Sequence, residues 1–198
     1  MPRLLDLLSS DTVDMGAVRD HLDALEHPAR LAEVVALGKS PQARLFDAAS
    51  GFRPIGLEHF VAVGRAPMRE VVHHGKNSLP LFNRFAKVFC MPDDPSAAER
   101  ELWGYNRNPA LVETTVGPGY FVAHSHDREG EVLIDYLQQP TRKPDAWPPI
   151  LPNSSRLSRF VYYRTQDVMR GVSEHVTIGR ATKGGREMPN WFVLCRED

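Results

Sequence analysis

Two histidines and an aspartate in the middle of the chain have the types and spacing of a metal or acid–base site. His124 and His126 are one residue apart in a strand-like run, so their side chains share a face. If the chain turns over 127–130 and His126 pairs with Glu131, Asp135 shares that face. Two imidazoles and a carboxylate suit zinc or iron, and they can also transfer protons. His124, His126 and Asp135 are therefore the candidate catalytic residues and metal ligands, with solvated strand histidines as the alternative.

A second polar run, HHGKN, lies at 73–77 inside an apolar neighbourhood. Adjacent strand histidines face opposite ways, so only one of the two can point inward. Gly75 would let a ligand approach the backbone, and Lys76 and Asn77 offer a charge and an amide. The alternative is a strand that ends at Gly75 with Lys76 in water. Together with polar and aromatic residues elsewhere, this run supplies the candidate ligand-binding residues, which are His74, Lys76, Asn77, Arg84, Tyr105, Tyr136 and Arg180.

The hairpin that carries the histidines spans 118–136, and the pairing of His126 with Glu131 sorts its side chains onto two faces. Such sorting is typical of strands with one buried face and one wet or functional face. The mostly apolar face carries Phe121, Ala123, Ser125, Val132, Ile134 and Tyr136. The mixed face carries Tyr120, Val122, His124, His126, Glu131, Leu133 and Asp135.

The strand-like run over 81–92 mixes charges with aromatic residues on both faces. Phe85, Lys87 and Phe89 alternate onto one face, and Arg84 lies on the other. This pattern is typical of a strand that lines a pocket with polar anchors, or of a protected sheet edge. Both interpretations stay open.

The composition is that of a folded protein with a sizeable core: 42% of residues are hydrophobic, 25% are charged and the net charge is -1. Near-neutral charge disfavours nucleic acid as a partner, and no apolar run approaches the roughly 18 to 20 residues of a membrane helix. We expect a cytoplasmic protein in which Cys90 and Cys195 are reduced core residues. The glycine motifs of nucleotide-binding loops and the GxSxG nucleophile motif are missing.

The order of elements predicts an α+β fold. Residues 3–50 read as short helices, with Ser10 or Asp11 as the cap of the first long one, and mainly strands follow from residue 52. A proline-rich crossing over 140–152, anchored by Trp147 and Ile150, leads to an amphipathic helix over about 153–170. A final hairpin joins 174–181 to 190–197 around a mobile loop.

We expect an N-terminal helical accessory segment, 1–50, packed outside an antiparallel β-rich domain, 51–198, in one continuous unit. The sheet would be strongly curved or a partly open barrel, with the 153–170 helix covering it or plugging one end. A cystatin-like cone, a long helix in a curved sheet, is the rival architecture.

Several stretches of the chain, among them HHGKNSLPLFNRFAKVFC, GPGYFVAHSHDREGEVLIDY and WPPILPNSSRLSRFVY, resemble conserved hypothetical bacterial proteins with no assigned function. The C-terminal VTIGRATKGG and WFVLCRED are similar to the closing hairpin of uncharacterised β-rich proteins named for a GxWxG motif. The chain lacks GxWxG itself. Neither resemblance implies an activity, a cofactor or a role for any residue.

Three functions follow from these patterns. The aromatic residues on the strands favour a small apolar or amphipathic ligand in a β-rich cavity. His124, His126 and Asp135, or His74 with Lys76, favour an enzyme. Residues 3–50 carry eight acidic against five basic side chains, which would favour a protein partner at the helices. The sequence does not identify a cofactor or an oligomeric state.

Overall fold

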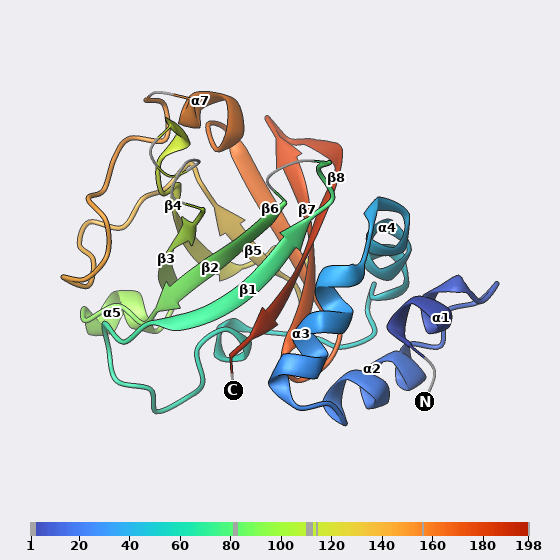
Figure 1. Ribbon diagram of the computed structural model, residues 1–198. Helices are drawn as coiled ribbons and strands as arrows, with labels where there is room; N and C mark the ends of the chain where they lie inside the picture. Colours follow the sequence, from blue (N-terminus) through green and yellow to red (C-terminus); the bar gives the residue numbers. More distant parts are fainter. Residues whose placement is uncertain (1–2, 81–82, 110–112, 114, 156, 198) are drawn as a thin grey trace.

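Eight antiparallel strands form a closed barrel within the residues that the computed structural model describes, which are 3–80, 83–109, 113, 115–155 and 157–197 (Figure 1). Each strand pairs with its neighbours in the chain, and β8 pairs with β1. The α+β prediction is confirmed, and the sheet closes completely instead of remaining a partly open barrel or a cone. The strands are β1 (Val71–Asn77), β2 (Arg84–Cys90), β3 (Glu101–Arg107), β4 (Tyr120–Ser125), β5 (Val132–Asp135), β6 (Thr165–Gly171), β7 (Val176–Lys183) and β8 (Arg186–Arg196).

The N-terminal helices pack against the outside of the barrel over β1, β7 and β8, as predicted (Figure 1). Asp14, and not Ser10 or Asp11, caps α2, because its carboxylate accepts a hydrogen bond from the Ala17 amide at 3.0 Å. No helix among the described residues is long and apolar enough to cross a membrane. The helices are α1 (Leu4–Ser9), α2 (Met15–Asp23), α3 (His27–Ala36), α4 (Lys39–Ala48), η1 (Leu57–His59), α5 (Pro95–Ala98) and α7 (Ser158–Val161).

The predicted hairpin register is confirmed: Val122 lies opposite Asp135, and the His126 amide donates to the Glu131 carbonyl at 3.0 Å. The apolar face points into the barrel, where Phe121 and Ile134 are fully buried. Gly104 on β3 makes room for the Phe121 ring, since a Cβ there would lie 2.4 Å from that ring. Along β4, residues therefore alternate between the barrel interior and its outer face.

The prediction of a helix over 153–170 is wrong. Among the described residues of this range, only α7 is α-helical, and β6 occupies most of the second half. Arg164 separates the two elements, and its φ of 60° is incompatible with a continuous α-helix. Leu157 and Val161 of the expected apolar stripe are exposed, and the side chain of Phe160 lies outside the described residues. Pairing with β5 and β7 overrides the helical pattern, because β6 is needed to close the barrel.

The final hairpin is longer and tighter than predicted. Gly184 and Gly185 both have positive φ, as a two-residue hairpin turn of the primed type requires. The expected mobile loop is therefore mostly ladder: Thr182 pairs with Glu187 and Lys183 with Arg186.

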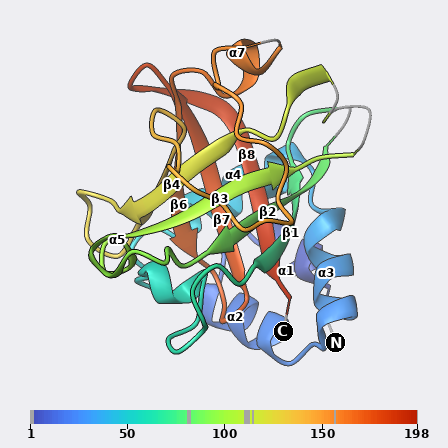
Figure 2. The same cartoon turned by 90° about the vertical axis from the view of Figure 1, so that its left-hand side faces the viewer.

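The proline-rich crossing runs over the outside of the barrel (Figure 2). Trp147 is buried there, with its ring centroid 4.9 Å from that of Tyr105, and Ile150 packs on the same cluster. Cys90 and Cys195 are both buried, in agreement with the prediction that they are core residues.

The barrel end near η1 holds two buried histidines. His73 points inward from β1 and hydrogen-bonds through Nε2 to the Phe60 carbonyl at 3.0 Å, and it is 1% exposed. Burial lowers the pKa of His73 to about 3, although the hydrogen bond to Phe60 opposes this shift. Burial, with a smaller contribution from His73, also lowers the pKa of His59 to about 3. Both rings are therefore neutral at pH 7.

We expect the stability to fall as the pH drops from about 6.5 toward 3, because the unfolded histidines take up protons there and the folded ones do not. Each histidine contributes a slope of up to about 1.4 kcal/mol per pH unit. His73→Gln should therefore flatten the pH dependence of the free energy of unfolding, measured by urea titration between pH 4 and 7. His124→Gln, on the outer surface, is the control; an equal slope in His73→Gln and the wild type would contradict this role of His73.

Candidate functional site

The barrel holds a cavity of about 150 Å³ that is lined in part by Val161 of α7. α7 lies over one end of the barrel (Figure 1). Inward-facing residues of β1, β2, β3, β6, β7 and β8 form its walls, and Tyr162, next to α7, lines it too. The lining combines aromatic rings with polar groups from different strands. Its principal residues are Phe85, Lys87, Asn106, Tyr136, Tyr162, Asp167 and Phe192.

Lys87 is the polar centre of this cavity. Its side chain is 2% exposed, and its Nζ donates to Asn106 Oδ1 at 3.0 Å, to Asp167 Oδ2 at 3.2 Å and to the Tyr136 hydroxyl. Asn106 lies directly opposite Lys87 on the neighbouring strand, whereas Asp167 reaches it from β6. A protonated Lys87 therefore has one acceptor for each of its three protons.

Aromatic rings surround the same ammonium group. Its nitrogen lies 4.9 to 5.7 Å from the centroids of four rings, close enough for cation–π attraction. These rings belong to Phe85, Phe121, Tyr136 and Phe192.

Burial dominates the protonation of the cluster. It lowers the pKa of Lys87, an effect that the Asp167 carboxylate opposes. Burial raises the pKa of Asp167, and Lys87 opposes that shift in turn. Burial and the Asp167 charge together raise the pKa of Tyr136 well above its usual 10.0. The pair therefore lies nearer to a proton transfer from lysine to aspartate than such a pair in water would.

Neighbouring polar groups fix the positions of these side chains. The Asn106 amide donates to the Gly119 carbonyl at 3.1 Å and to the Tyr136 hydroxyl at 2.9 Å. The Tyr136 ring stacks on that of Tyr162, with centroids 5.1 Å apart. Gly119, at φ 56°, leaves room for the Tyr162 ring, which a Cβ would meet at 2.4 Å. These contacts hold the cluster in its arrangement.

The predicted histidine site lies elsewhere, on the outer face of the β4–β5 hairpin. His124 Nε2 is 3.9 Å from Asp135 Oδ2, and His126 is nearer to Glu131, at 3.7 Å. Asp135 accepts hydrogen bonds from the Leu137 amide and the Gln138 side chain. Both histidines line an outer hollow that does not include Asp135. No group of three or more His, Cys, Asp or Glu side chains within the described chain could hold a metal ion.

Of the predicted ligand-binding residues, Asn77 and Tyr136 line the cavity. The alternation of each strand places the others on the outer surface. His74 Nε2 lies 2.5 Å from a Glu197 carboxylate oxygen, and the Tyr105 hydroxyl accepts a hydrogen bond from Arg107 at 3.0 Å. Gly75 was expected to admit a ligand, but the side chains of Leu194 and Phe85 occupy the space next to it. The residues on the outer face are His74, Lys76, Arg84 and Arg180, together with Tyr105, which is buried against Trp147.

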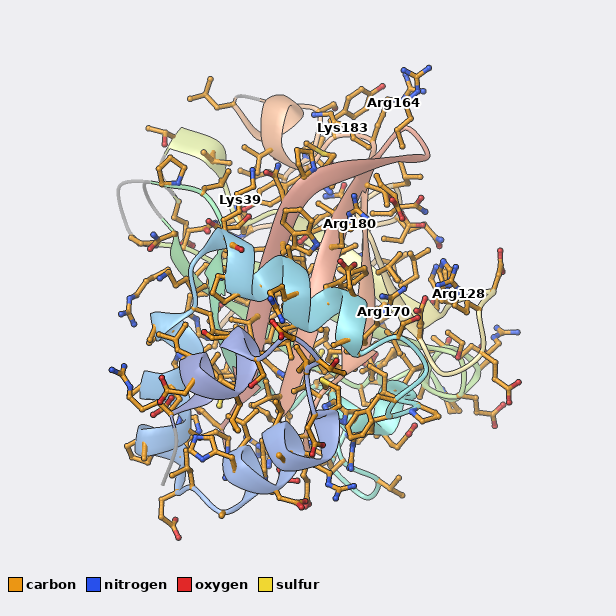
Figure 3. The ribbon with its side chains drawn as sticks, turned by 90° about the vertical axis from the view of Figure 1, so that its right-hand side faces the viewer. Lys39, Arg128, Arg164, Arg170, Arg180 and Lys183 are labelled. Carbon is orange, nitrogen blue, oxygen red and sulfur yellow. The ribbon has the colours of Figure 1, made fainter. Side chains whose placement is uncertain are left out.

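Arg180 belongs to a basic side of the molecule next to α4 (Figure 3). A hollow of about 180 Å³ lies there, lined among others by Arg128, Arg170 and Arg180. Carboxylates already pair with these groups, since Arg170 Nε is 2.7 Å from Glu131 and an Arg180 nitrogen is 2.8 Å from Glu187. The arginines therefore join strands and helices and do not form an open anion site.

The residues that sequence reasoning missed are Lys87, Asn106, Tyr162 and Asp167. A signal for Lys87 was present, since it alternates with Phe85 and Phe89 on a face with pocket character. Asp167 gave no such signal, because its segment has a helical pattern. Asn106 gave no signal either, because only the barrel places the last inward residue of β3 at the cavity.

The fold and the site define a closed antiparallel β-barrel with a polar cluster at the base of an end cavity. No protein-family model matches the chain. No curated protein and no solved structure matches it either.

Proposed function

We propose that the protein binds a small ring-containing molecule with a polar substituent in the end cavity of the barrel. The observation that carries this proposal is the buried Lys87–Asp167 pair, which lies at the cavity wall and not in solid core. Burial of a charged pair is costly, and a well-packed apolar replacement often stabilises a protein more. A role toward a ligand accounts for a pair that stability alone does not favour.

The size and the lining of the cavity define the class of ligand. A cavity of about 150 Å³ matches the volume of an engineered protein cavity that binds benzene. Phe85, Phe192 and Tyr162 offer aromatic faces to such a ring. Lys87 and Asn106 then place hydrogen-bonding groups at the polar end of the ligand. A ring with one hydroxyl or carbonyl group fits both features.

Benzyl alcohol is a suitable first probe, because it has one ring and one hydroxyl group. For its eight heavy atoms we expect a dissociation constant on the order of 1 mM, or about -4 kcal/mol. The measurement is an NMR titration of side-chain amides. The Asn77, Asn106 and Asn108 amides, at the cavity, should shift, whereas the Gln42 amide, buried under the helices, should not.

Filling the cavity should abolish binding. Ala181 lines the cavity from β7, and Ala181→Leu adds three carbon atoms to that wall. Ala36→Leu, at the exposed end of α3, is the matched control. Equal binding in both variants, or shifts confined to the outer face near His124, would refute the proposed site.

A further inference from the structure

We propose that Lys87 is an amine nucleophile that forms an imine with a small aldehyde or ketone in the end cavity. This inference rests on the proposed function and specifies its ligand as a carbonyl compound. It is carried by the position of one lysine. All five lysines of the chain lie within the described residues; Lys87 alone is buried, and it lines the cavity.

The neighbours of Lys87 match what an amine nucleophile requires. Attack needs the neutral amine, and a carboxylate in a dry site can take the proton. Asp167 Oδ2 lies 3.2 Å from Nζ, and it is buried with it. The direction of both pKa shifts, downward for Lys87 and upward for Asp167, favours this transfer. The Tyr136 hydroxyl contacts the same nitrogen and can donate to a departing oxygen.

The reaction balances without an oxidant or a reductant. Lys87 transfers one ammonium proton to Asp167, and the freed lone pair attacks the carbonyl carbon while the π electrons move to oxygen. A proton then passes from nitrogen to that oxygen, which gives a carbinolamine. Protonation by Asp167 expels the hydroxyl group as water as the nitrogen lone pair forms the C=N bond. The products are one water and a protonated imine that faces the restored Asp167 carboxylate.

Other polar groups of the cavity suit the adduct. Asn106 lies next to Lys87 on β3 and offers both an amide donor and an acceptor near the reacting atoms. Phe85 and Phe192 flank the amine, so a substituent on the carbonyl carbon would lie against aromatic faces. The cluster can thus bind the uncharged carbonyl compound first and the positively charged imine after the reaction.

The test uses benzaldehyde with sodium cyanoborohydride, which reduces an imine to a stable secondary amine by hydride transfer. Mass spectrometry of the intact protein and of its peptides should find one benzyl group on Lys87. We expect labelling of Lys87 to be at least tenfold faster than that of Lys39, Lys76, Lys143 or Lys183. Benzyl alcohol should slow labelling at Lys87 and leave Lys76 unaffected.

Variants locate the reaction further. Lys87→Arg keeps the charge but cannot form an imine, so it should lose this adduct, whereas Lys76→Arg, on the outer surface, should keep it. If Lys87→Arg does not fold, the distribution of label among the five wild-type lysines still tests the inference. Labelling spread evenly over exposed lysines would overturn it.

The two proposals fail in different ways. If benzyl alcohol shifts the Asn106 amide but benzaldehyde leaves Lys87 unlabelled, the cavity binds ring compounds and the imine inference is wrong. If benzyl alcohol does not bind and Lys87 stays unlabelled, both proposals are wrong.

Discussion

Asp167→Asn is expected to destabilise the protein by about 3 to 5 kcal/mol, as removal of one partner from a buried ion pair does elsewhere. The substitution leaves the Lys87 ammonium among four aromatic rings without a countercharge. Part of the loss is recovered when Lys87 gives up its proton, since burial already lowers its pKa. The free energy of unfolding from urea titration at pH 7 measures the effect.

The double variant Lys87→Met/Asp167→Leu is the matched control, because it removes both charges and fills similar volume. It should unfold with a free energy near that of the wild type or above it, and it should bind benzyl alcohol more weakly, because the contact with Lys87 is lost. If the single and the double variants lose the same free energy, the unpaired Lys87 charge is not the cause of the loss, and packing explains the effect of Asp167→Asn.

Leu45→Ala is expected to cost about 2 to 5 kcal/mol, because it removes a fully buried side chain. Leu45 lies on α4 in a cluster that also contains Val176, Ile178 and Val193 of the barrel. From this shared cluster we expect the helices to unfold together with the barrel. We expect some amides of β3, on another side of the barrel, to exchange hydrogen only by global unfolding. In Leu45→Ala these amides should then exchange at least about 30-fold faster than in the wild type.

Leu137→Ala, at an exposed site, is the control and should change stability by less than about 0.5 kcal/mol. The opposite result would be that, in Leu45→Ala, α1 to α4 lose protection from hydrogen exchange while β3 and β4 keep theirs. In that case the helices are an accessory layer, as the division near residue 50 predicts, and the barrel folds without them.

Local patterns in the sequence determine much of the fold. The helices over 4–48 follow from apolar spacing and terminal residues, and the β4–β5 register follows from one polar turn. Trp147 and Ile150 anchor the proline-rich crossing because large apolar side chains there have few other places to be buried. These features depend on residues close in the chain, which is why the sequence alone predicts them.

Other features of the fold depend on closure of the barrel, and only the tertiary structure decides them. Residues 165–171 have an apolar spacing compatible with a helix, but β5 and β7 leave a gap in the ladder that only a strand fills. Closure also settles which face looks inward, since a period of two fits either choice until a partner covers one face. The covering helices and Trp147 make the outer face of several strands as buried as the inner one.

The site depends on closure most of all. Lys87 is in β2 and Asp167 is 80 residues later in β6, and they meet only because the barrel brings opposite walls together. No local spacing encodes that contact. The sequence marks single polar residues among aromatic ones, whereas the distance between their charged atoms, and hence their pKa shifts and their chemistry, arises only when the sheet closes on itself.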